Sequence, residues 1–187
     1  MAQGEDEITA SSVARAAGVL VIGGDQALMG DAVQDQAFAQ ALERAVHRPT
    51  PVMTDGAATA IMGESYVTNP DPVTGVSAAA SAAFRADGTQ LADGLGIVDG
   101  FTLEPTLTYD YRWGRLYGAA YDNPELVSLG ISELTALRVD RAGGSVTGER
   151  SVIAVDGSDA TWLVGGNGAL GAVNVWMNAF GPGDALG

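Results

Sequence analysis

The chain contains, at residues 18–25, the stretch GVLVIGGD, which decides how its fold is interpreted. An uninterrupted apolar run closed by two glycines and an acid is typical of a buried parallel strand that ends in a tight loop. Residues 31–47 follow with apolar positions at helical spacing, and an Arg-Pro pair ends this predicted helix. Another short strand begins at Pro51, and a helix is predicted over 57–62. This alternation predicts an α/β fold with a parallel sheet.

The segments on either side are assigned from local composition. A short helix is predicted from Thr9 to Ala17, before the strand. Residues 68–94 are rich in Pro, Gly, Ala and Asp, which indicates turns, with one brief helix in the stretch SAAASAAF. A helix rich in Tyr and Arg is predicted over roughly 109–121, and residues 144–180 have the short β-type runs of a strand meander. We see no repeat or linker and expect one domain over residues 1–187, with an ordered core at about 9–180.

Composition and charge limit the classes of function. The formal net charge is −14, and all 9 basic residues are arginines, a balance that repels nucleic acid. No apolar run is long enough for a membrane span and the N-terminus lacks a secretory pattern, so we expect a cytoplasmic protein without a membrane partner. Cysteine is absent, which excludes disulfides and thiolate chemistry. We expect no cofactor and no metal, because the acids Asp31, Asp35 and Glu43 fit a solvated helix face.

Three sets of motifs occur in a fixed order along the chain. The first is IGGDQ at residues 22–26, and the second is TDGAATAIMG at residues 54–63. The third combines GLGIV at 94–98, RWGRL at 112–116 and NPELVSLGISELTAL at 123–137. In this order and at this spacing, over about residues 10–180, they resemble cyanophycinase and its relative peptidase E, a family of serine peptidases. The resemblance implies a three-layer α/β sandwich with a mainly parallel sheet, truncated here at its N-terminal edge.

The same resemblance implies where a catalytic site would lie. Such a site needs a serine on a strained strand-to-helix turn, a histidine that takes its proton and an acid that orients the histidine. Backbone N–H groups of a glycine-rich loop stabilise the oxyanion. By this resemblance Gly23 and Gly24 lie in the oxyanion region, and Glu133 matches the acid.

The chain departs from the family at the two residues that transfer the proton. The serine position falls on Gly56, and the histidine position falls on Thr106. Glu104, two residues earlier, stands where the family has an aspartate, which on its own says little. Thr59 is the hydroxyl nearest the turn, but no histidine accompanies it, and His47 fits an exposed helix end. We therefore expect that a Ser-His mechanism cannot run in this chain alone.

Several retained polar residues have two interpretations each. Asp25 and Gln26 could contact a ligand at the carboxyl end of their strand, or Asp25 could cap the next helix. Asp55 could be an acid left in the pocket or an ordinary turn residue. Arg112 and Arg115 could bind the carboxylates of an acidic or aspartyl peptide, or belong to an interface or the core. Glu133 could persist only because strand packing requires its shape.

The start of the chain bears on its partners. Family members carry further strands before the GGDQ strand, and their absence would expose a sheet edge and an apolar face. We expect a homo- or hetero-oligomer to cover that edge. The leading function is a non-catalytic binding or structural subunit. The alternatives are an active hydrolase of aspartyl peptides completed by a partner chain, and a self-assembling structural protein that reuses the fold.

Overall fold

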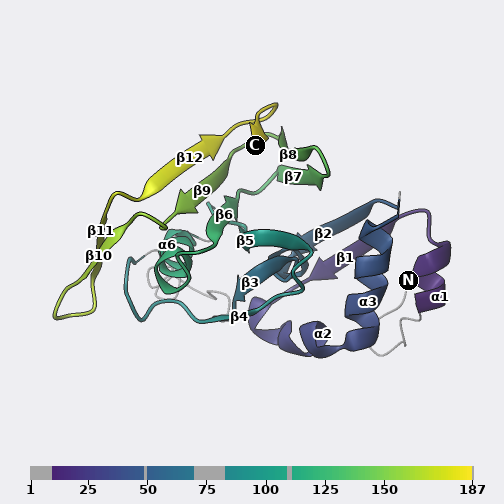
Figure 1. Cartoon of the computed structure of the whole chain (residues 1–187), viewed down its shortest axis with the longest axis horizontal. Coiled ribbons are helices and arrows are strands. Elements are labelled where there is room, and N and C mark those ends of the chain that lie inside the picture. Colours follow the sequence, from purple (N-terminus) through teal and green to yellow (C-terminus); the bar gives the residue numbers. More distant parts are fainter. Residues whose placement is uncertain (1–9, 49, 70–82, 109–110, 187) are drawn as a thin grey trace.

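The computed structural model describes residues 10–48, 50–69, 83–108 and 111–186. Its first unit is a two-stranded parallel sheet flanked by helices, with β1 (Val19–Gly23) paired in register with β2 (Val52–Gly56). The helical segments of this unit are α1 (Ala10–Arg15), η1 (Gln26–Leu28), α2 (Gly30–Gln34), α3 (Gln36–Val46) and α4 (Ala57–Ala60). Figure 1 shows α1, α2 and α3 gathered at one end of the molecule.

A six-stranded sheet forms the centre of the molecule, in the order β12-β9-β6-β5-β3-β4. Its strands are β3 (Gly63–Val67), β4 (Leu91–Asp93), β5 (Val98–Pro105), β6 (Val127–Ile131), β9 (Val152–Asp156) and β12 (Trp176–Phe180). The helix α6 (Trp113–Asp122) connects β5 to β6. Two smaller antiparallel sheets are formed by β7 (Thr135–Asp140), β8 (Gly143–Gly148) and β13 (Ala185–Leu186), and by the hairpin of β10 (Thr161–Val164) and β11 (Leu170–Val173).

The predicted three-layer sandwich with a mainly parallel sheet is wrong. Among the described strands, three pairs are parallel and six are antiparallel. Parallel strands need a long crossover, which the helices supply between β1 and β2 and between β5 and β6. In the second half of the chain, short turns join only the hairpins β7–β8 and β10–β11, and β6, β9 and β12 pair antiparallel although these hairpins separate them in the sequence. β1 and β2 also form a separate sheet, so they are not the truncated edge of a larger parallel sheet.

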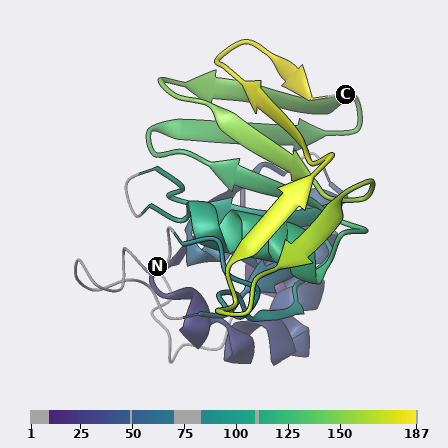
Figure 2. The ribbon, with the colours of Figure 1, turned by 90° about the vertical axis from the view of Figure 1, so that its left-hand side faces the viewer.

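The core lies on both faces of the six-stranded sheet because its strands alternate their side chains. In β9, Val152 and Ala154 join the main cluster, while Ile153 and Val155 join the cluster beneath α6. The main cluster is closed by the inner face of β1 and β2, by α3 and by the small sheet of β7 and β8. Figure 2 shows the strands of the second half stacked above α6 and the helical end of the molecule.

The helix predicted over residues 31–47 is two helices. Asp35 stands between α2 and α3 with extended backbone, and its carboxylate accepts hydrogen bonds from the backbone N–H groups of Ala37 (2.9 Å) and Phe38 (3.2 Å). Asp35 is thus the N-cap of α3 rather than a residue on a continuous helix face, since an aspartate at this position competes for backbone donors.

The remaining assignments were largely right. The first helix is confirmed as Ala10–Arg15, the Tyr- and Arg-rich helix as Trp113–Asp122, and the strand meander after residue 144 as β8 to β12. Residues 70–82, which contain most of the predicted brief helix, and residues 109–110 lie outside the described residues. Within the part of the chain that is described, no helix is both long and apolar enough to cross a membrane.

Candidate functional site

The turn from β2 through Gly56 into α4, called the elbow below, is where the resemblance places the nucleophile. Gly56 has φ 59° and ψ −136°, a backbone conformation that residues with a Cβ rarely adopt. Gly56 pairs in register with Gly23, and a Cβ added at Gly56 would overlap the carbonyl oxygen of Gly23. The end of β1 therefore occupies the space that the side chain of a nucleophile would need.

The other side chains of the elbow are hydrogen-bonded to each other, buried in the core or exposed. The hydroxyl oxygens of Thr54 and Thr59 lie 3.0 Å apart and form a hydrogen bond. Ala57 and Ala58 are buried against the core. Asp55 lies within β2 rather than in a turn, and its side chain is exposed. The Thr59 hydroxyl is thus hydrogen-bonded to the hydroxyl of Thr54 in this structure.

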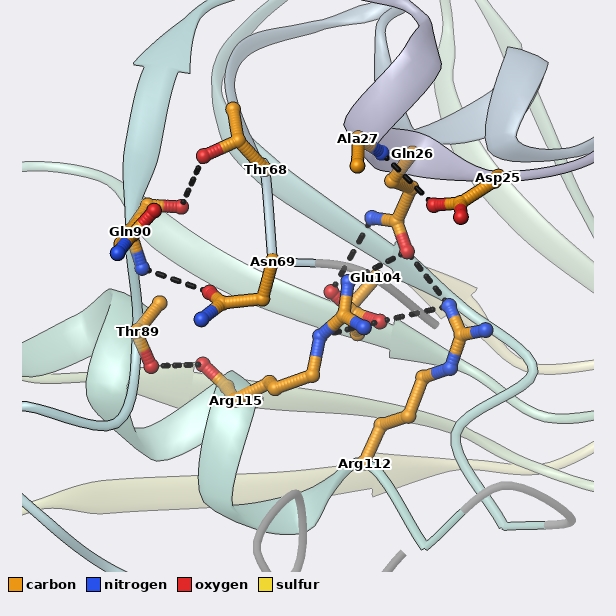
Figure 3. Close-up of polar contacts among 10 residues, drawn as sticks. All are labelled: Asp25, Gln26, Ala27, Thr68, Asn69, Thr89, Gln90, Glu104, Arg112 and Arg115. Carbon is orange, nitrogen blue, oxygen red and sulfur yellow. Dashed lines mark hydrogen bonds and ion pairs between the residues drawn. The ribbon is translucent and has the colours of Figure 1, made fainter. Parts of the chain in front are cut away.

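A buried polar cluster of Gln26, Glu104, Arg112 and Arg115 joins two of the motif segments, residues 22–26 and 112–116, to the strand β5. Gln26 follows β1, Glu104 lies near the end of β5, and both arginines come from the start of α6. Figure 3 shows their side chains converging on the Glu104 carboxylate. All four are almost inaccessible, with Gln26 and Glu104 at 0%, Arg115 at 1% and Arg112 at 4% exposure.

The contacts within this buried cluster are specific. The Arg112 guanidinium donates to Glu104 Oε1 at 3.0 Å and to Gln26 Oε1 at 2.6 Å. The Arg115 guanidinium donates to the same Gln26 oxygen at 2.6 Å, and its Nε lies 3.4 Å from Glu104 Oε1. The Gln26 amide donates to Glu104 Oε2 at 3.4 Å. Gln26 thereby bridges the two cations and the anion.

Electrostatics in the buried cluster is a balance of burial and charge. Burial raises the pKa of the Glu104 carboxyl, while the guanidinium groups of Arg115 and Arg112 act against that rise. With the carboxyl ionised, the cluster holds two positive charges against one negative charge. Removing Glu104 from this buried set would take away the carboxylate that both guanidinium groups bind, which is strongly destabilising. The cluster therefore ties α6 to the end of β1 through charge as well as through packing.

The predicted ligand residues do not all lie in one place. Gln26, Arg112 and Arg115 meet in the buried cluster, where their side chains contact each other and Glu104. Asp25 caps η1, since its carboxylate accepts from the N–H of Ala27 at 2.9 Å. Their roles toward a ligand stay predictions.

The two glycines at the end of β1, Gly23 and Gly24, have different surroundings. A Cβ at Gly23 would overlap the backbone of Ala57 and Ala58, so Gly23 allows β1 to pack tightly on the elbow. A Cβ at Gly24 would meet nothing within 4 Å, and Gly24 is exposed. Their assignment to an oxyanion site stays a prediction.

Glu133, the predicted acid, lies in a second polar group at the ends of β5 and β6. Its carboxylate accepts hydrogen bonds from the Thr108 hydroxyl and from Arg150, whose Nη1 is 3.4 Å away. Arg150 also donates to the Thr108 hydroxyl at 3.1 Å, and its backbone N–H donates to Thr135 Oγ1 at 2.9 Å. Glu133 thus binds a cation and a hydroxyl where the family resemblance implies a histidine partner.

Positive φ angles mark the predicted catalytic positions. Thr106, the histidine position, has φ 55°, and Leu134, next to Glu133, also has φ 55°. Such angles are costly for residues with a Cβ and cluster at functional sites in proteins. β5 and β6 are parallel, so these two residues follow strand ends at the same edge of the sheet. Strained backbone therefore occurs at both positions on one edge of the sheet, and their catalytic roles stay predictions.

Sequence reasoning named Glu104 but missed its role as the buried partner of the two arginines. A carboxylate near the end of an apolar strand, followed by two arginines three residues apart on one helix, could have indicated a buried ion pair. His47 caps the end of α3 and is exposed, as predicted. Within the described ranges, no three His, Asp or Glu residues come together in a way that could hold a metal ion.

Comparison with known proteins identifies the fold of the chain but no family. No protein-family model matches this sequence. In three dimensions, the chain has the fold of a protein solved as a peptidase. That structure is a peptidase from an acI-B1 actinobacterium, with which it shares 16% sequence identity at a TM-score of 0.58. The match covers 95% of this chain and 62% of the actinobacterial chain, so this chain spans less than two thirds of the length of that peptidase.

Proposed function

We propose that this chain is a non-catalytic relative of the cyanophycinase and peptidase E family, acting as a binding or structural subunit. The observation that carries the proposal is the elbow. At the position of the nucleophile stands Gly56, and the Gly23 carbonyl occupies the space beside it. The histidine position is Thr106, and the one histidine in the sequence, His47, lies at the exposed end of α3. A peptidase of this type needs both groups for acyl transfer.

The buried cluster supports the same proposal. In a site that recognises a carboxylate, arginines must present donors to a ligand. Arg112 and Arg115 are instead inside the protein and bound to Glu104 and Gln26. The two arginines therefore stabilise the fold and do not present donors to a substrate, which supports a structural role.

The binding role falls on the outer face of the β1–β2 sheet. Leu20, Ile22 and Met53 are 60%, 70% and 67% exposed there, although parallel sheets are ordinarily covered on both faces. Asp55, in register with Ile22, also lies on this face. Self-association would bring the Asp55 carboxylates of two acidic chains together, whereas an apolar segment with basic residues complements the face. We therefore assign this face to a different chain.

A turnover assay tests the absence of catalysis. The purified chain is incubated with β-aspartyl-arginine polymer and with Asp-X dipeptides, and product release is measured beside the Thr59→Ala and Glu133→Gln variants. The expected result is the same background for all three proteins. Turnover by the natural chain that Thr59→Ala abolishes would overturn the proposal, because it would identify Thr59 as a substitute nucleophile.

A further inference from the structure

Residues 160–183, called the uncharged arm below, differ from the rest of the chain in charge. This stretch of 24 residues contains no Asp, Glu, Lys, Arg or His, while the whole chain carries 32 charged side chains and a net charge of −14. The arm comprises β10, β11 and β12, and Figure 1 shows it at the opposite end of the molecule from α1. Apart from the exposed Arg85–Asp87 ion pair, which contacts the backbone of Asn167 in the hairpin, the arm is therefore a surface where an acidic chain can approach another acidic chain without placing like charges in contact.

The uncharged arm also exposes apolar side chains. Leu163, Val164 and Val173 of the hairpin are 59%, 52% and 52% exposed, and Trp176 and Met177 of β12 are 63% and 55% exposed. Figure 2 shows the hairpin on the face toward the viewer. The exposed apolar side chains therefore lie on both faces of the arm, and large apolar side chains gathered in one exposed segment favour an interaction site.

The strand β12 adds a free hydrogen-bonding edge to this surface. It is the terminal strand of the six-stranded sheet and pairs with β9, and among the described strands none pairs with its outer side. Natural proteins protect such edges with charged residues, with proline or with bulges, because an unprotected edge pairs with another strand. β12 reads WMNAF and has none of these charges or prolines.

The uncharged arm also borders a pocket beside the β10–β11 hairpin. It has a volume of about 270 Å³ and is lined by uncharged side chains, among them Phe84, Tyr117 and Trp162. Phe84 and Tyr117 pack with ring centroids 4.7 Å apart, so two aromatic rings form one wall. An uncharged, concave wall beside an apolar edge suits an apolar protein surface better than a charged ligand.

We propose that the uncharged arm is the interface of a homodimer in which β12 pairs with β12 of a second copy. Antiparallel pairing about a two-fold axis makes the interface self-complementary, the commonest arrangement of dimers, and joins the two six-stranded sheets. A second copy is favoured over an anionic membrane or a nucleic acid because the chain is strongly acidic. It is favoured over a basic partner because the arm offers no carboxylate to bind one.

Cross-linking tests the geometry directly, because the chain contains no cysteine. Asn178 is the middle residue of β12, so pairing about a two-fold axis places its two copies at or near opposite positions. Opposed residues of antiparallel strands have Cα atoms roughly 4.5–5.5 Å apart, within reach of a disulfide. We expect Asn178→Cys to form a covalent dimer on oxidation or with a short bis-maleimide. Met53→Cys, on the β1–β2 face, is the matched control and should stay monomeric. A covalent dimer of the Met53→Cys chain alone, or of neither chain, would overturn the proposal.

A charge substitution tests the energetics with the same pair of sites. Sedimentation velocity of the natural chain should give a dimer, and Met177→Lys should raise the dissociation constant at least about tenfold, because like charges brought together at an interface are costly. Met53→Lys should leave the dimer unchanged, and near-unchanged melting temperatures would show that both variants fold. Added salt should tighten the natural dimer, since it screens the repulsion of two acidic chains without weakening an uncharged interface.

Three results would contradict the dimer: a natural chain that stays monomeric, dissociation by Met53→Lys in place of Met177→Lys, or weakening by salt. This proposal does not depend on the absence of catalysis, so the turnover assay and the sedimentation experiment can fail separately.

Discussion

Introducing a serine at Gly56 is the perturbation that the elbow constrains most sharply. The variant Gly56→Ser restores the hydroxyl that the family resemblance implies, but it does so at φ 59° and ψ −136°. Placing a Cβ in the left-handed region costs roughly 1–2 kcal/mol. The added Cβ also overlaps the Gly23 carbonyl, and overpacking of this kind typically costs about 1–3 kcal/mol. We therefore expect Gly56→Ser to lower the free energy of unfolding by about 2–5 kcal/mol.

Denaturant and thermal unfolding provide the assay for Gly56→Ser. In a chain of this size, each kcal/mol lowers the melting temperature by about 2–4 °C, so the variant should melt roughly 4–20 °C below the natural chain. Gly24→Ser is the matched control: nothing lies within 4 Å of its added Cβ, and its stability should change by no more than about 0.5 kcal/mol. Equal stability of Gly56→Ser and Gly24→Ser would refute the conclusion that the Gly23 carbonyl fills the elbow.

Three further predictions concern the buried cluster, the side chain of Tyr66 and the break between α2 and α3. Glu104→Met should cost about 3–5 kcal/mol, because it removes the carboxylate that both buried guanidinium groups bind. Arg138→Met, which breaks an exposed pair with Asp140, should cost at most about 1 kcal/mol in the same denaturation experiment. Similar losses for the two variants would contradict the assignment of the buried cluster. Burial raises the pKa of Tyr66 above its ordinary value of 10.0, so its contribution to stability is complete below about pH 10 and is lost as the pH rises toward the folded pKa. Stability measured across that range should fall less for Tyr66→Phe than for the natural chain, and parallel curves would count against the prediction. Asp35→Ala should cost about 1 kcal/mol through loss of the N-cap of α3, and a continuous helix over residues 31–47 would instead gain stability from the alanine.

The local features of the fold could be predicted from the sequence, but the pairing of the strands could not. The apolar run of β1 and the turn at Gly56 follow from composition and from glycine positions. Periodicity identifies a strand without naming its neighbour, so the antiparallel partners of β9 were not predictable from the pattern alone. Helical spacing continues across Asp35, which hid the break that its side chain creates.

The sequence predicts most residues of the candidate site, but it does not predict which contacts they make. The motifs selected Gln26, Arg112 and Arg115, and the structure places them together. What the motifs could not give is Glu104 as their common partner, because a single carboxylate in a strand does not reveal which distant cations it meets. Burial decides this outcome: inside the core, the arginines must be paired by the protein itself.

The central claim is that no activated nucleophile exists in this chain, and covalent labelling tests it most directly. The natural chain is incubated with an excess of a fluorophosphonate, which reacts with activated hydroxyl groups, and its intact mass is measured beside a serine peptidase as the positive control. The account predicts an unchanged mass for this chain and a stoichiometric adduct for the control. A stoichiometric adduct on this chain, above all one mapped to Thr59, would contradict it.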